Sequence, residues 1–176
     1  MSTLTLDKVH SSLDFQIKHM MVSKAKGEFK DFDVDFKGDL NNLSEASVTV
    51  TIPVTSINTG NEDRDNHLRS GDFFEAEKYP NMVFESKSIK KKSDDEFEVT
   101  GDFTVKGVTN EETFTVEYNG TAKSPLDNSM VAGFDVSGTI NREAYGMTYN
   151  AALETGGVLL GKDVKFQGEF EFVVSE

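Results

Sequence analysis

Residues 97–105, with the sequence FEVTGDFTV, indicate most clearly which kind of fold this chain adopts. Phenylalanine, valine or glycine stands at every second position, and glutamate, threonine or aspartate fills the positions between. Successive side chains of a β-strand point to opposite faces of the sheet. The alternation therefore predicts a strand with one buried face and one solvated face.

Seven other segments show the same alternation, so we expect about eight strands in all. A parallel sheet covered by helices would show continuous apolar runs instead, which makes antiparallel pairing the prediction. Short polar turn signals separate the segments. The predicted fold class is therefore all-β and antiparallel. The seven segments are 13–17, 32–36, 48–54, 82–84, 114–118, 132–140 and 164–174.

An interruption at about residues 61–78 predicts one or two short helices between strands. Asn61 is a suitable N-cap for the first helix, and Arg69 complements the dipole near its end. Asp72 has a glutamate three residues further on, which is a capping-box arrangement for a second helix. We read both helices as one excursion from a single sheet.

The length and composition bound the possible functions. The chain has 176 residues and shows no linker, repeat or low-complexity segment, which predicts a single domain over 1–176. Lys and Arg number 18 against 31 Asp and Glu, so the net charge is −13. This acidity argues against nucleic acid as a partner and against stable association with an anionic membrane. The absence of cysteine excludes disulfides, cysteine nucleophiles and thiolate metal sites.

The chain shows no targeting or membrane segment. No run reaches the roughly 18 apolar residues of a membrane helix. The start lacks the roughly 7–15 residue apolar run of a signal peptide. We therefore expect a soluble, cytoplasmic protein, and an envelope location only if a leader has been removed from the natural sequence.

An antiparallel sheet with one apolar face can form a two-layer sandwich or a closed barrel. A barrel of eight strands has an interior that side chains fill, or that is just wide enough for one small ligand. The alternation alone does not decide between a filled interior and one that holds a ligand.

Four motifs along nearly the whole chain resemble, in the right order, those of the YceI-like family. Asn141 and Tyr145 stand where that family more often has Asp and Phe. The motifs are Asp7, His10, Ser11, Ser12, Phe15 and His19; Ser56–Asn61 with Arg64, Asp65, Leu68, Asp72–Phe74 and Tyr79–Pro80; Gly101–Thr109; and Thr139–Arg142 with Tyr145–Gly146.

The resemblance implies an extended lipocalin-like, eight-stranded antiparallel barrel that is often a homodimer. It also implies a non-catalytic binding or carrier protein that needs no cofactor. The ligand held in its elongated apolar pore would be a long amphiphile, namely a polyisoprenoid, an isoprenoid quinone or a fatty-acid derivative.

Twelve apolar residues on the alternating segments are the candidate pore lining. The alternative is an ordinary filled core, which would make the protein a dimeric interaction module. Arg64 or Arg69 is the candidate contact for an anionic head group. The alternative there is a structural network, in which Asp65 pairs with Arg69 and Asp72 caps a helix. The candidate lining residues are Leu13, Phe15, Ile17, Val34, Phe36, Val50, Ile52, Phe84, Phe134, Val136, Phe170 and Phe172.

A different class of function is a small lipid-modifying enzyme that uses His19, His67 or Asp72. No metal site is expected, because the three histidines show no HxH or HExxH spacing. In addition, His10 and His19 are nine positions apart and would face opposite sides of one regular strand.

Overall fold

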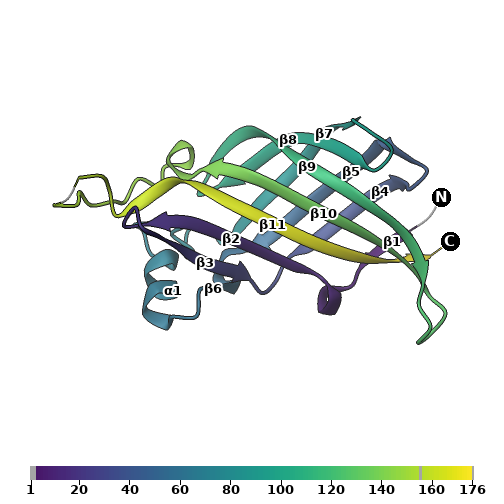
Figure 1. Cartoon of the computed structure of the whole chain (residues 1–176), viewed down its shortest axis with the longest axis horizontal. Coiled ribbons are helices and arrows are strands. Elements are labelled where there is room, and N and C mark those ends of the chain that lie inside the picture. Colours follow the sequence, from purple (N-terminus) through teal and green to yellow (C-terminus); the bar gives the residue numbers. More distant parts are fainter. Residues whose placement is uncertain (1–2, 155, 176) are drawn as a thin grey trace.

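The computed structural model describes residues 3–154 and 156–175, which form one curled antiparallel sheet of eleven strands (Figure 1). One α-helix and three short 3-10 helices complete the described chain. The strands are β1 (Thr3–Leu6), β2 (Ser12–His19), β3 (Ser23–Phe29), β4 (Asp33–Asp39), β5 (Asn42–Pro53), β6 (Ile57–Asn58), β7 (Asn81–Lys91), β8 (Glu96–Val105), β9 (Val108–Lys123), β10 (Met130–Asn141) and β11 (Leu160–Ser175). The helices are η1 (Lys8–His10), η2 (Val54–Ser56), α1 (Glu62–Arg69) and η3 (Arg142–Tyr145).

The strand order is β4-β5-β7-β8-β9-β10-β11-β2-β3-β6, and β1 pairs with β11 beside this path. Strand β10 occupies one edge of β11, so β1 and β2 share the other edge. β1 pairs with residues 172–175 of β11, and β2 pairs with residues 160–169. Because β1 also lies against β4, which is the first strand in this order, the sheet closes on itself. Where β1 closes the ring, the wall consists of β4, β5, β7, β8, β9, β10, β11 and β1, which are the eight strands predicted for the barrel. Strands β2, β3 and β6 continue the sheet beyond this ring.

The seam where β1 meets β4 has no backbone ladder in the described chain. Instead, Lys8 in η1 forms ion pairs with Asp31 and Asp33, at 3.0 and 3.4 Å. Both pairs are well exposed, so they contribute little to the free energy of unfolding. The seam is therefore the part of the barrel wall that backbone hydrogen bonds hold least.

All eight predicted segments lie in or beside strands, and β1, β3 and β6 were not predicted. β1 and β6 are only four and two residues long. β3 lacks the apolar alternation because small residues, Ala25 and Gly27, lie opposite Ile17 and Phe15 of β2. A Cβ at Gly27 would lie 2.5 Å from the Phe15 ring, so the phenyl group packs directly on the backbone of β3.

The first predicted helix is confirmed as α1, in which the Asn61 side chain accepts a hydrogen bond from the Arg64 amide at 3.0 Å. The second predicted helix does not form, and residues 71–79 make turns instead. Their amides bond back to the end of α1, with Phe74 N–H donating to the Leu68 carbonyl at 3.0 Å. Asp72 accepts from His67 rather than capping a helix. No helix in the described part of the chain is long and apolar enough to cross a bilayer.

Candidate functional site

A cavity of about 470 Å³ lies inside the barrel. All twelve residues proposed as pore lining line it, because β2, β4, β5, β7, β10 and β11 each turn alternate side chains inward. Lining residues run from α1 at one end of the barrel to Leu43 and Phe172 near the other. The inward aromatic rings therefore do not fill the interior, and the apolar interior is an elongated tube.

Aromatic packing narrows the tube without closing it. The Phe84 and Phe114 rings lie 5.3 Å apart between centroids, and the Phe114 and Phe166 rings meet edge to face at 4.8 Å. A Cβ at Gly138 would lie 2.5 Å from the Phe114 ring, so the glycine leaves the room that this ring occupies. The bare backbone of β10 thus helps to set the width of the cavity.

Other lining residues were not singled out from the sequence. Phe103 on β8 and Phe114 on β9 follow the alternation that marked the twelve, and that signal would have found them. Phe73, Tyr149 and Leu159 come from irregular segments near α1 and before β11, where no periodicity marks an inward side chain.

Ionisable groups gather toward one end of the cavity. Apart from tyrosines, six line it, of which five are basic, although acidic residues outnumber basic ones in the whole chain. Figure 1 shows α1 and the segment before β11 at one end of the barrel and both termini at the other. His19 ends β2, Arg64 and His67 lie in α1, and Arg142 begins η3, which places these four at the α1 end. The other two are Asp14 and Lys26.

The two arginines proposed for head-group contact have different positions. Arg64 lines the cavity, and its guanidinium donates to the Thr59 hydroxyl at 2.8 Å and to the Thr59 carbonyl at 2.7 Å. Arg69 is not part of the lining. It donates to the carbonyls of Thr55 and Ile57, both at 3.2 Å, and so fastens α1 to η2 and β6.

The proposed pairing of Asp65 with Arg69 is not formed. The Asp65 carboxylate is buried and accepts from the Thr59 amide at 2.9 Å and from the Thr59 hydroxyl at 2.5 Å. Because Thr59 also accepts from Arg64, these three residues form one chain of hydrogen bonds. It positions the start of α1, whose Arg64 lines the cavity.

The residues proposed for catalysis are only partly together. His67 Nε2 lies 2.9 Å from Asp72 Oδ2, and its ring meets those of Phe73 and Tyr149 edge to face. His19 and His67 line the cavity, whereas Asp72 does not. The carboxylate thus holds His67 in place from outside the cavity, within a small aromatic cluster at the α1 end.

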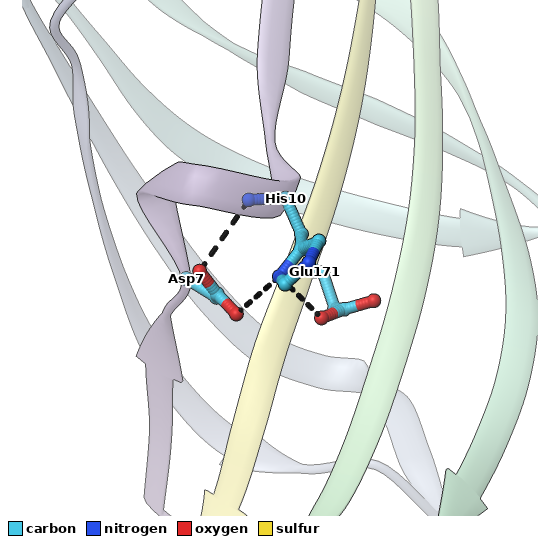
Figure 2. A group of neighbouring side chains, drawn as sticks. All are labelled: Asp7, His10 and Glu171. Carbon is cyan, nitrogen blue, oxygen red and sulfur yellow. Dashed lines mark hydrogen bonds and ion pairs between the residues drawn. The ribbon is translucent and has the colours of Figure 1, made fainter. Parts of the chain in front are cut away.

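A cluster of three ionisable side chains, Asp7, His10 and Glu171, lies on the outside of the barrel, where η1 separates β1 from β2 (Figure 2). His10 Nδ1 is 2.8 Å from Asp7 Oδ2 and 3.5 Å from Glu171 Oε2. The hydrogen bond to Asp7, with the charges of both carboxylates, raises the pKa of His10. The same hydrogen bond lowers the pKa of Asp7. His10 lies in η1 and His19 ends β2, so the premise that they share one strand is wrong, although His19 lines the cavity and His10 does not.

The three side chains are spaced closely enough to hold a cation. Hydrogen bonds account for their arrangement without one. The Asp7 amide donates to the Glu171 carbonyl at 2.8 Å, and the Ser11 hydroxyl links the Asp7 carbonyl to the Glu171 amide. The group joins η1 to β11 and lies outside the cavity lining.

Comparisons with known proteins agree with this architecture. A UPF0312 protein of Staphylococcus aureus strain N315 is 57% identical over 176 residues, with both chains covered completely. The crystal structure of a Campylobacter jejuni YCEI protein superposes with a TM-score of 0.76 at 34% identity, covering 98% of each chain. A polyisoprenoid binding domain from Saccharophagus degradans has the same fold, with a TM-score of 0.71 at 14% identity over 99% of this chain and all of that one. The family model for the YceI-like domain matches residues 4–172, and the chain therefore belongs to the YceI-like domain family.

Proposed function

We propose that this protein binds and carries a long-chain hydrophobic molecule, such as a polyisoprenoid, an isoprenoid quinone or a fatty-acid derivative. The observation that carries the proposal is the elongated cavity of about 470 Å³, lined almost wholly by apolar side chains. Its volume lies within the range usual for small-molecule sites. The Saccharophagus degradans domain with this fold is named for polyisoprenoid binding, which supports the same class of ligand.

The mechanism is shielding from water. Each CH₂ group that leaves water for an apolar site gains about 0.8 kcal/mol. A chain of many such groups can therefore bind tightly with few polar contacts. The acidic outer surface, with a net charge of −13, keeps the loaded protein dispersed. We place the twelve predicted lining residues against the hydrocarbon and Arg64 near the polar end. We also propose a homodimer in the cytoplasm.

Native mass spectrometry of gently purified protein tests the proposal. A bound mass of several hundred daltons, released on denaturation and identified by lipid analysis, is the expected result. Repeated spectra of ligand-free protein that also fails to take up prenyl and acyl probes would contradict it. Turnover of an added prenyl lipid that is lost in His19→Ala would favour a lipid-modifying enzyme instead.

A further inference from the structure

Arg142 is the one charged residue of the cavity lining that is buried, with 3% of its surface exposed. Its Nε donates to the Gly161 carbonyl at 2.8 Å, and its Nη1 donates to the Met147 carbonyl at 2.7 Å. Its Nη2 is buried and has no hydrogen-bond partner among the described residues. A guanidinium has five N–H donors, so part of this group is left unsatisfied inside the protein.

The charge of Arg142 also lacks a counter-ion. None of the ion pairs in the described ranges includes this side chain. The Glu112 carboxylate forms no ion pair with Arg142 and instead accepts a hydrogen bond from the buried Tyr145 hydroxyl. Burial lowers the pKa of Arg142, and the charge of neighbouring Glu143 opposes this with a smaller effect. A buried cation is costly unless a partner neutralises it, and here the cavity is where a partner can enter.

The rest of the lining indicates the direction in which a ligand would lie. The α1 end holds Arg142, Arg64 and two histidines. The end near the termini is lined by Leu43, Phe97 and Phe172, which belong to a separate apolar cluster. A molecule with one polar end would therefore have that end near α1 and its chain toward the termini.

We propose that Arg142 binds an anionic head group, a carboxylate or a phosphate, at the α1 end of the cavity. This inference rests on the proposed function and adds to it the charge of the ligand and its direction in the barrel. An anion satisfies the free N–H donors and the charge at once, whereas an alcohol or a quinone oxygen satisfies only the donors. The cavity thus selects acidic amphiphiles over neutral ones of the same chain.

The test compares probes that differ only in the head group. Hexadecanoic acid, hexadecyl phosphate and hexadecanol compete at pH 7.5 for a fluorescent acyl probe bound to the wild-type protein. We expect at least one of the two anions to bind about tenfold or more tightly than the alcohol. The stronger of the two identifies the head group as carboxylate or phosphate.

Two variants assign the preference to Arg142. Arg142→Gln removes the charge, and we expect it to lose the preference for the anions over the alcohol. Lys162→Gln removes the same charge from an exposed neighbour of Gly161, and it should keep the preference. Preference that survives Arg142→Gln but disappears in Arg64→Gln would overturn the assignment to Arg142.

The wild-type measurements decide the matter even if Arg142→Gln fails to fold. Equal binding of all three probes overturns the anion site and leaves the carrier function standing. Binding of none of them, nor of prenyl probes, overturns the carrier function and the anion site with it.

Discussion

Phe170 on β11 meets Phe32 edge to face across the barrel interior, with ring centroids 5.5 Å apart. Phe32 lies in the bend between β3 and β4, and Phe170 lies opposite Phe134 of β10. The contact joins the bend between β3 and β4 to β11. Phe170 also lines the cavity, so a change there alters the lining.

Phe170→Asp should abolish uptake of a fluorescent prenyl or acyl probe. A carboxylate without a partner is costly in an apolar cavity, and hydrocarbon cannot solvate it. Fluorescence titration measures the uptake, and circular dichroism checks the fold. Gln167→Asp, which adds the same charge to an exposed position of β11, is the matched control and should bind normally. Normal uptake by a folded Phe170→Asp protein would remove this residue from the lining.

Asp65→Ala should loosen the start of α1, where Arg64 lines the cavity. The substitution leaves the Thr59 amide without its acceptor, at a cost of about 1–3 kcal/mol in the free energy of unfolding. Because the Asp65 carboxylate also orders Arg64 through Thr59, we expect faster release of a bound probe in stopped-flow exchange. Asp63→Ala, at an exposed position of α1, is the control. Identical release rates in the two variants would show that the hydrogen bonds among Asp65, Thr59 and Arg64 do not slow the release of the probe.

Tyr145→Phe should lower the free energy of unfolding by roughly 1–2 kcal/mol. The Tyr145 side chain is completely buried, and its hydroxyl donates to the Glu112 carboxylate. Burial raises the pKa of the phenol most, and the Glu112 carboxylate raises it further. Urea unfolding gives the change. Glu112→Gln keeps an acceptor for the hydroxyl and should cost less. A Tyr145→Phe protein as stable as the wild type would mean that the hydrogen bond only offsets the burial of its partners.

The link between Asp7 and His10 should depend on pH in a defined direction. The pKa of His10 is raised above its ordinary 6.5, so its contribution to stability is complete below that value and is lost as pH rises through the folded-state pKa. The pKa of Asp7 is lowered below 3.8, so its contribution is present above that value and is lost in stronger acid.

A double-mutant cycle measures this dependence. With Asp7→Asn, His10→Gln and the double variant, the coupling in thermal unfolding should be larger at pH 5.5 than at pH 9. Exposed His67, paired with Asp72, offers a second histidine–aspartate pair away from η1, and cycles at both places separate a local effect from a general one. Equal coupling at the two pH values would contradict the ion pair at His10.

The strands and most of the lining could be predicted because alternation reports directly which side of a sheet is buried. Strands without that period could not be predicted. β3 turns Ala25 and Gly27 inward, and their small size hides the pattern. The burial of Arg142 was also missed, because only the fold brings the carbonyls of Met147 and Gly161 to its guanidinium. The second helix was predicted from Asp72 as its cap, but the fold brings His67 to that carboxylate instead.

The seam between β1 and β4 bears on how broad a cargo the barrel accepts. Elsewhere in the wall, separating two neighbouring strands breaks a ladder of backbone hydrogen bonds. At this seam, side-chain packing and the exposed Lys8 pairs are all that must yield. Under the proposed carrier function, we expect the barrel to widen at the short β1–β4 contact without losing a backbone ladder, and so to accept methyl-branched chains as well as thin saturated ones.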